Sequence, residues 1–515
     1  VPETITNNRN ETLFGIGGAL RRMGFSEDSV LACLKVTNSE ICAPPLEDGE
    51  LQVLVAKVSK YDRGSLIKTS GVRPGDGLEL DLGSEAEMAD WVLRQLEIEG
   101  WRCVWDQSKL RVYRDSKGYW IDLDENTVAD MILKLDGAWK GNGKKRGKIS
   151  ISERMVKGVY SLICRKRSIP GHFSEGTPGI VFADKIRVGL DEKPVACHAK
   201  FKDLWCLKES FKDWEGVKPH LFLSFLDDAF GQLVDGAARI QIIREFIGAC
   251  LLGVAPDYQK AMLFTGRGAN GKSVLLKVIE AMFPEEGRAS IAPQFFDQEY
   301  YRANLVGKNI NVVSEVPEVD MLATESFRAL VTGDTVAGRE PYGKPFSFRS
   351  RAGQIFAANS LPGVRDLSEA FWRRWIVVDW PRIIPLNLRD ERLGDKLVSC
   401  ELGGVILWAL EGGRALINRG AYCIPKSSLE ALEGWRGGSD QIVLFAQEEI
   451  LGAPGDFLGG GEIYRKYHVW ANVNGFGKMN RGKLMKRLEL LGYKKDRKSK
   501  ERGLIIPEIP KMLET

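Results

Sequence analysis

The glycine-rich segment at 261–283, AMLFTGRGANGKSVLLKVIEAMF, constrains this chain more than any other part of it. An apolar run predicts a buried strand before the glycines, and apolar positions at helical spacing predict a helix after them. Glycines let backbone N–H groups converge on phosphate oxygens, while Lys272 reaches the terminal phosphates and Ser273 offers a hydroxyl to Mg²⁺. The segment therefore predicts a nucleoside triphosphate site. Its residues are Gly266, Arg267, Gly268, Ala269, Asn270, Gly271, Lys272 and Ser273.

Three further strand-like runs follow, and each has a polar residue at one of its ends. INVVS is followed by Glu315, a carboxylate placed to hold Mg²⁺ or to polarise the attacking water. GQIFAANS ends near Asn359, whose amide is placed to sense the γ-phosphate. FWRRWIVVDW has Arg373 and Arg374 just before its apolar run. An arginine there suits stabilisation of the charge on the transferring phosphoryl group, either in the same subunit or in a neighbouring one. These four residues are the predicted catalytic partners of Lys272.

The order of these motifs resembles the superfamily 3 helicases, the ring-forming AAA+ motors of small viruses, phages and plasmids. Within that superfamily the chain is most similar to the poxvirus-type and satellite-phage-type primase-helicases. GRGANGKS corresponds to the A motif, VVSE to the B motif, IFAANS to the C motif and RR to the arginine finger. Many members carry two acidic residues at the B motif, whereas here Ser314 precedes Glu315, so Glu315 has the metal and water role alone. Whether Arg373 or Arg374 is the finger stays open.

A basic and aromatic hairpin is predicted between the B and C motifs, at 331–348. Two glycines bracket a tip that contains Arg339, Tyr342 and Lys344, and β-forming residues flank it. The resemblance implies that this hairpin projects into the ring channel and holds DNA, with lysine on phosphate and tyrosine on a base. The alternative is an ordinary surface turn.

The C-terminal segment concentrates positive charge. From Lys478 to Arg502 there are eleven Lys or Arg and three acids, a local net charge of +8 in a chain of net charge +4. The segment resembles a winged-helix domain, because it has an amphipathic helix, a second helix with Asn480 as N-cap, and a charged β-like stretch. Such a domain suits binding to the phosphates of duplex DNA. A solubilising tail is the alternative. The predicted DNA-binding residues here are Lys483, Lys486, Arg487, Lys494 and Lys495.

The N-terminal segment resembles the small helical domain that follows the catalytic domain of archaeo-eukaryotic-type primases. Short amphipathic helices flank a break at CAPPL, and the chain starts close to this unit, at Val1. The resemblance implies a fragment of a longer primase-helicase, with a primase domain before Val1. The expected fold is α/β: an AAA+ P-loop motor with a parallel sheet, helical and α+β N-terminal domains, and a C-terminal winged helix. The expected domains are 1–62 (primase C-terminal type), 63–85 (linker), 86–235 (helicase N-terminal), 236–435 (motor) and 436–515 (winged helix).

Primer synthesis is not expected from this chain. Asp122 and Asp124 have the spacing used in two-metal nucleotidyl transfer, but no Ser-x-His follows and His198 lies in an unrelated context. The two aspartates are interpreted as a strand-to-helix turn, with Glu125 and Asn126 starting the helix.

Composition sets the remaining limits. No apolar run approaches the ~20 residues that span a bilayer, and no signal peptide opens the sequence. Nine cysteines lack a CxxC pair, and the cluster of Cys197, His198 and Cys206 lacks a fourth zinc ligand, which predicts a reducing bacterial cytosol and no metal centre.

The combined prediction is an ATP- and Mg²⁺-dependent DNA helicase. The resemblance implies a hexameric ring that acts on single-stranded and forked DNA, without membrane association, in replication of a phage, prophage or plasmid. Two other functions stay open: an ATP-switched DNA-binding initiator or loader that melts DNA without processive unwinding, and a P-loop regulatory ATPase. The hairpin and the basic C-terminal segment disfavour the regulatory ATPase.

Overall fold

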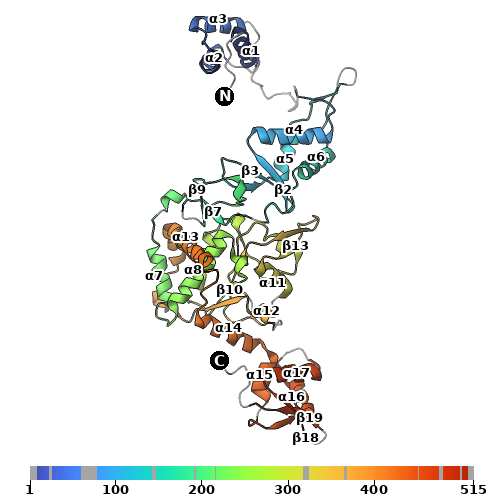
Figure 1. The fold of residues 1–515 in the computed structure, drawn as a ribbon, viewed down its shortest axis with the longest axis vertical. Helices are drawn as coiled ribbons and strands as arrows, with labels where there is room; N and C mark the ends of the chain where they lie inside the picture. Colours follow the sequence, from blue (N-terminus) through green and yellow to red (C-terminus); the bar gives the residue numbers. More distant parts are fainter. Residues whose placement is uncertain are drawn as a thin grey trace. The chain divides into compact units, whose positions relative to one another are not determined.

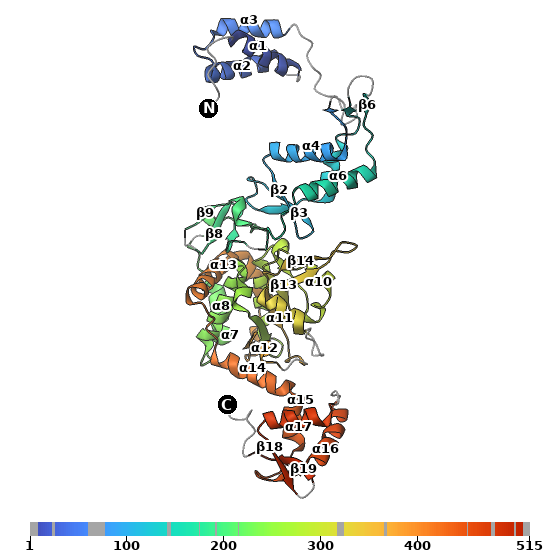
Figure 2. The same ribbon diagram turned by 45° about the vertical axis from the view of Figure 1, so that its right-hand side comes forward.

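The chain divides into two compact units. One comprises Val1–Gly83 with Leu133–Ser152, and the other comprises Ser84–Ile132 with Glu153–Thr515. Their elements are drawn in Figure 1 and, turned by 45°, in Figure 2. A computed structural model describes residues 9–22, 26–59, 78–141, 146–174, 176–190, 193–214, 216–316, 324–364, 368–450, 452–474, 479–498 and 501–507.

The first unit contains a helical bundle and a small sheet. Ser26 accepts a hydrogen bond from the backbone N–H of Ser29 and so caps the second helix. The bundle core includes Leu13, Leu34 and Leu51. The predicted linker 63–85 lies mostly outside the described residues, and its described end contains a strand. The elements are α1 (Arg9–Arg22), α2 (Glu27–Ile41), α3 (Asp48–Val58), β1 (Glu79–Leu80), β5 (Trp139–Lys140) and β6 (Gly147–Lys148).

The second unit begins with helices around an antiparallel sheet of order β2-β3-β4. Asp122 ends β4 and pairs with Lys109 at 2.7 Å and Arg111 at 2.9 Å, while Asp124 accepts hydrogen bonds from the backbone N–H of Asn126 and Thr127. The interpretation of these aspartates as a strand-to-helix turn is therefore confirmed. The elements are α4 (Glu85–Ile98), β2 (Arg102–Asp106), β3 (Lys109–Tyr113), β4 (Trp120–Asp122), α5 (Glu125–Leu133) and α6 (Glu153–Lys166).

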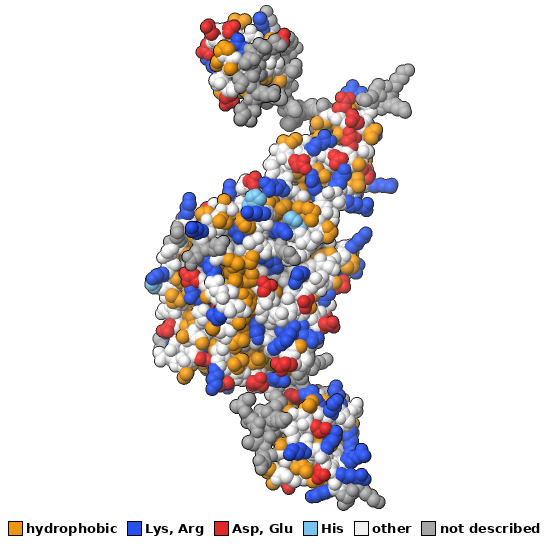
Figure 3. Space-filling view, in the orientation of Figure 1, with side chains coloured by type: hydrophobic (Ala, Val, Ile, Leu, Met, Phe, Trp, Pro, Cys, Tyr) orange, Lys and Arg blue, Asp and Glu red, His pale blue; other side chains and the backbone are white. Residues whose placement is uncertain are grey.

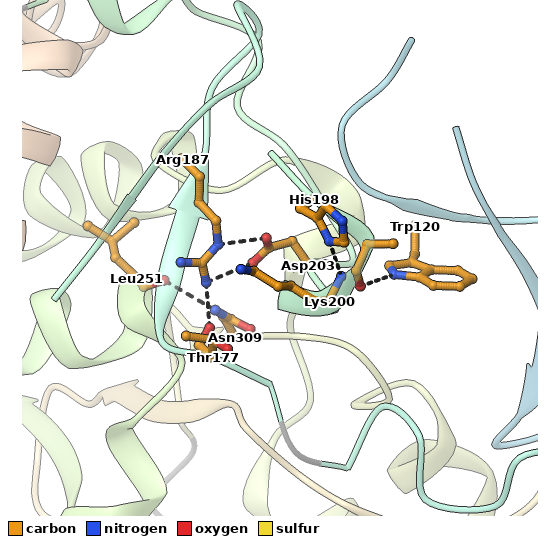
Figure 4. Close-up of polar contacts among 9 residues, drawn as sticks. Trp120, Thr177, Arg187, His198, Lys200, Asp203, Leu251 and Asn309 are labelled. Atoms are coloured by element: carbon orange, nitrogen blue, oxygen red, sulfur yellow. Dashed lines mark hydrogen bonds and ion pairs between the residues drawn. The ribbon is translucent and has the colours of Figure 1, made fainter. Parts of the chain in front are cut away.

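A second antiparallel sheet, β7-β8-β9, precedes the central part of this unit. Arg187 on β8 is 2% exposed and forms a bidentate contact with Asp203, at 2.7 and 3.2 Å (Figure 4). The same guanidinium donates to the Thr177 carbonyl at 2.5 Å, so this ion pair fixes the loop around the sheet. The strands are β7 (Gly179–Val181), β8 (Ile186–Gly189) and β9 (Val195–Ala196).

The centre of the second unit is a five-stranded sheet with the order β11-β12-β15-β10-β16, in which all neighbours are parallel. Its inner strands are buried along their whole length, as expected for a parallel sheet covered on both faces. A mixed α/β fold with a parallel sheet is thus confirmed. The strands are β10 (Ala261–Thr265), β11 (Arg288–Ala289), β12 (Ile310–Val313), β15 (Gly353–Ala357) and β16 (Trp375–Asp379).

Helices cover both faces of this sheet, and alternate residues of β10 belong to the two resulting cores. Met262 and Phe264 pack on one side, whereas Ala261 and Leu263 pack on the other. The helices are α7 (His220–Phe230), α8 (Gly236–Leu252), α9 (Lys272–Ala281), α10 (Glu299–Ala303), α11 (Thr324–Thr332), α12 (Glu369–Trp372), α13 (Leu393–Arg419) and α14 (Lys426–Ser439).

The C-terminal part contains three helices around a sheet of order β17-β19-β18. The side chain of Asn480 accepts a hydrogen bond from the Lys483 N–H at 2.8 Å, which confirms it as the N-cap of α17. The inward faces of α16 and α17 carry Tyr467, Leu484 and Leu488, which are buried. Within the described residues, no helix is long and apolar enough to cross a membrane. The elements are α15 (Gln441–Glu449), β17 (Phe457–Gly459), α16 (Gly460–Val473), α17 (Arg481–Leu490), β18 (Lys494–Lys498) and β19 (Glu501–Ile505).

Candidate nucleotide-binding site

The glycine-rich loop joins the carboxyl end of β10 to the amino end of α9, as the sequence predicts. Gly271 has φ of +95° and caps α9, while Gly266 has φ of +134°. A Cβ at Gly266 would lie 2.5 Å from the Trp380 carbonyl oxygen, so the close approach of two backbones requires glycine there. Apart from the Lys272 N–H, which donates to Asn270, the first N–H groups of α9 have no partner within the helix and suit an anion.

The loop is held by hydrogen bonds to the chain that follows β16. Asn270 is 4% exposed, donates to the Trp380 carbonyl at 3.2 Å and accepts from the Lys272 N–H at 3.3 Å. The Ile384 N–H donates to the Ala269 carbonyl at 2.9 Å. Asn270 thus stabilises the loop conformation and is oriented by its own partners.

Lys272 is the most buried cation of the loop, at 6% exposed. Its Nζ donates to the carbonyl oxygens of Gly266 and Arg267. Burial lowers the pKa of this ammonium, and the nearby carboxylate of Asp379 partly opposes that shift. A triphosphate in the loop would add negative charge beside this ammonium.

The loop opens into a cavity of about 620 Å³, which also brings together the ends of β12 and β15. These strands are neighbours in the sheet, so Glu315 and Asn359 meet at its carboxyl edge. The Asn359 Nδ2 lies 3.5 Å from a Glu315 carboxylate oxygen. The cavity is therefore lined jointly by Lys272, Ser273, Glu315 and Asn359.

A further wall of the cavity was not predicted from the sequence. It is formed by α7, through Leu221, Phe225 and Asp228, and by the segment 382–393. Arg382 joins the two because it donates to the backbone carbonyl of Asp228 and lies 3.4 Å from its carboxylate. The apolar residues of α7 were a possible signal in the sequence, but the predicted domain bounds placed them in the helicase N-terminal domain, 86–235.

The two arginines before β16 do not line this cavity. Arg374 is 8% exposed, and its guanidinium donates to the Ala370 carbonyl one helical turn back. Arg373 is exposed. The structure thus gives different environments to two residues between which the sequence left the choice of finger open.

The predicted hairpin is confirmed as β13 (Thr335–Gly338) paired antiparallel with β14 (Phe346–Arg349). At its tip Tyr342 is fully exposed, with relative exposure of 105%, and has φ of +61°, an uncommon conformation for a non-glycine residue. Lys344 is also exposed. Arg339, by contrast, donates from Nε to the Gly343 carbonyl at 3.1 Å, so it supports the turn itself.

The predicted DNA-binding cations of the C-terminal part fall into two groups. Lys483, Lys486 and Lys494 are exposed, and Figure 3 shows Lys and Arg side chains gathered on this part of the chain. Arg487 instead pairs with the buried Asp440, and Lys495 lies 2.6 Å from Glu489.

The Cys197, His198 and Cys206 cluster has structural contacts. The His198 Nδ1 accepts the Lys200 N–H at 3.0 Å, and the Cys206 thiol donates to the Leu207 carbonyl (Figure 4 shows the histidine). Across the described ranges no group of His, Cys, Asp and Glu has a metal-binding arrangement.

Two family models match the chain. Residues 2–63 match primase C terminal 1 (PriCT-1), and residues 264–374 match a family of unknown function, DUF5906. The putative helicase L207/L206 of Acanthamoeba polyphaga mimivirus is 24% identical over 173 residues, which span 30% of this chain and 17% of that protein's length.

Solved structures of the NrS-1 C-terminal region are also similar. Its A-form apo structure is 12% identical with a TM-score of 0.44, and the match covers 81% of this chain and 98% of the other. A further apo structure of the same region is 12% identical with a TM-score of 0.41, covering 82% and 99%.

The sequence matches confirm the resemblance to primase-helicase-type proteins. The primase C-terminal match covers the helices α1 to α3, where the sequence predicts such a domain. The second family match includes the glycine-rich loop, Glu315, Asn359 and Arg373.

Proposed function

We propose that this chain is an ATP-dependent DNA helicase of the superfamily 3 AAA+ type, with a C-terminal winged helix, that acts in replication of a phage, prophage or plasmid. The observation that carries the proposal is the single cavity in which Lys272, Ser273, Glu315 and Asn359 meet at the carboxyl edge of a parallel sheet. In open α/β sheets, ligands bind at this edge.

The lining residues fit ATP and Mg²⁺. Lys272 would neutralise the terminal phosphates, and the N-terminus of α9 would stabilise the remaining negative charge of the phosphates. Ser273 and Glu315 would hold Mg²⁺, which supplies further charge neutralisation when bound. Asn359, already in contact with Glu315, would orient that carboxylate and sense the γ-phosphate.

The wall formed by α7 fits the nucleoside. Leu221 is 41% exposed although it is apolar, and it lies on the cavity together with Phe225, whose ring would be 3.0 Å from a Cβ at Gly271. A base against these side chains would remove apolar surface from water.

The Leu221→Ala variant is expected to raise the KM for ATP about fivefold with little change in kcat, because about 1 kcal/mol of apolar contact is made equally in the ground and transition states. Inhibition by tripolyphosphate, which lacks a base, should be unchanged. Steady-state ATPase kinetics measure both. Leu429→Ala, at a similarly exposed leucine on α14, is the control. Equal weakening of ATP and tripolyphosphate would place the base elsewhere.

The hairpin is the proposed DNA contact. A bulky aromatic side chain that is fully exposed in a left-handed conformation has no packing role to explain it. Base stacking gives Tyr342 a role, and Lys344 beside it would hold phosphate.

Tyr342→Gly is expected to weaken single-strand binding about tenfold, since stacking on one base contributes about 1–3 kcal/mol. Glycine adopts the observed φ without strain, so the turn should survive. Lys344→Ala should lower the salt dependence of binding by about one unit of slope. Both variants should reduce DNA-stimulated ATPase more than basal ATPase, whereas Lys426→Ala, an exposed lysine on α14, should not. Parallel loss of basal and stimulated rates would make the tip a structural turn.

The decisive experiment is strand displacement on forked DNA with ATP and Mg²⁺, alongside DNA-stimulated ATPase. A helicase separates the strands processively. The second candidate, an ATP-switched initiator or loader, would bind and melt DNA without processive strand separation. The exposed cations of the C-terminal part support this candidate as well as they support a helicase. Absence of any DNA effect on hydrolysis would contradict both.

A further inference from the structure

The segment that follows β16 is attached at two points to the elements that form the nucleotide cavity. The Ile384 N–H donates to the carbonyl of Ala269 in the glycine-rich loop at 2.9 Å. Further along, the segment leads into α13 at Leu393, and α13 packs against α9. Ile384 and Leu393 both line the cavity. The residues between these two attachments, 385–392, are therefore held beside the cavity.

Arg389 is a cation of this stretch that lines the cavity. Its Nε donates to the Ile384 carbonyl at 2.9 Å, and its backbone N–H donates to the Leu386 carbonyl at 3.3 Å. Ile384 is thus bonded to Arg389 through its carbonyl and to the glycine-rich loop through its N–H. The Arg389 side chain is exposed, yet these two hydrogen bonds tie the position of its guanidinium to that of the loop.

The acidic side chains near Arg389 are engaged by other cations. The adjacent Asp390 pairs with Lys396 at 2.6 Å, and the hydrogen bond from Lys396 lowers the pKa of this carboxyl. Asp228 on α7 is contacted by Arg382. Within the described ranges, no ion pair joins Arg389 to an acidic residue. Its positive charge is therefore available to an anionic ligand in the cavity.

The wall to which Arg389 belongs indicates which phosphates lie beside it. Ser273 and Glu315, the proposed Mg²⁺ ligands, lie at the start of α9 and just after β12. The segment of Arg389 is instead joined to α7 by the contact of Arg382 with Asp228. Since α7 provides the proposed nucleoside contact, a guanidinium on this wall is placed toward the nucleoside side of the triphosphate. A guanidinium binds phosphate through two parallel N–H···O bonds.

We infer that Arg389 binds the phosphates that ATP and ADP share, in the cavity of its own chain, and that it contributes to nucleotide affinity and not to the chemical step. The inference rests on the proposed nucleotide site and adds to it a phosphate contact from outside the glycine-rich loop.

Nucleotide binding by the full chain tests this role. Arg389→Met is expected to raise the Kd of fluorescent ATP and ADP analogues by the same factor of about tenfold, because one charged hydrogen-bonding contact is lost. In steady-state ATPase measurements KM should rise by a similar factor, with kcat within about twofold of wild type, since the contact is made equally in the ground and transition states. Arg389→Lys keeps the charge without the planar fork, so its affinity should be intermediate.

Arg392→Met is the matched control. Arg392 lies three residues away and is exposed, but it does not line the cavity, so both Kd values should be those of the wild type. Salt provides a second readout. The difference in Kd between wild type and Arg389→Met should shrink as the salt concentration rises from about 0.1 M to about 1 M, because a contact between an exposed guanidinium and a phosphate is screened.

The possible outcomes distinguish this inference from the proposed function. Equal affinities of Arg389→Met and wild type for both nucleotides would overturn the inference and leave the proposed ATPase standing. A loss confined to ATP would place the guanidinium at the γ-phosphate and contradict a contact with the shared phosphates. A loss of the same size at every salt concentration would reduce Arg389 to a support for the Ile384 carbonyl. A wild type that binds neither nucleotide contradicts the proposed function, and the inference falls with it.

Discussion

Replacing Lys272 with alanine is expected to reduce ATP hydrolysis by at least 10²–10³-fold, the cost of losing one preorganised charged contact to a reacting phosphate. The ammonium is buried in the loop with only carbonyl partners, so its removal deletes no ion pair that stabilises the fold. Steady-state ATPase measurements test the rate, and circular dichroism tests the fold.

The variant should also lose most of the thermal stabilisation that saturating ATP gives to the wild type. A ligand at 100 times its Kd stabilises the native state by about 2.7 kcal/mol, which is readily measured as a shift in Tm. Lys277→Ala is the matched control, because Lys277 lies on the same helix and pairs with Asp395 at 2.6 Å on the surface. Hydrolysis by Lys272→Ala near the wild-type rate would remove this loop from the mechanism.

The parts of the site that follow from local sequence were predictable. Glycines, an apolar strand and a helical period determine the loop between β10 and α9 without help from the rest of the chain. The meeting of Glu315 and Asn359 was predictable for a different reason: both follow strands of a parallel sheet, and the carboxyl ends of such strands share one edge.

Other parts depend on packing between distant segments. Leu221 and Asp228 reach the cavity because α7 packs in the same core as α9, a relation that no local pattern encodes. Arg487 lies on a basic helix and was predicted to bind DNA, yet its partner Asp440 is 47 residues away and buried. A charge pattern in the sequence identifies exposed cations well only where no acidic residue from a remote part of the sequence lies close in space.

Burial also distinguishes residues of one type that are adjacent in sequence. Arg373 and Arg374 have the same chemistry, and both lie between the end of α12 at Trp372 and the start of β16 at Trp375. Even so, the side chain of Arg373 faces solvent, whereas that of Arg374 folds onto the helix. Arg339 and Lys344 differ similarly at the hairpin, where only the first donates to the turn. The roles proposed here follow from these contacts.

The Glu315→Gln variant is expected to bind ATP as tightly as the wild type and to lose turnover by about 10²–10³-fold. Glutamine has nearly the same shape, and its carbonyl oxygen can still accept from Asn359, so the local hydrogen bond should persist. The lost group is the negative charge that would hold Mg²⁺ and polarise the attacking water, and Ser314 beside it provides no second carboxylate.

Equilibrium binding of a fluorescent ATP analogue and single-turnover hydrolysis separate these two effects. Glu391→Gln is the control, since Glu391 also lines the cavity but belongs to the segment after β16 and does not follow a strand of the parallel sheet, and its kcat should stay within about twofold of wild type. Loss of nucleotide binding in Glu315→Gln would show that the carboxylate organises the cavity rather than the reaction. Near-normal turnover would show that a different carboxylate has the metal and water role, because one preorganised charge at the reacting phosphate is expected to dominate the rate.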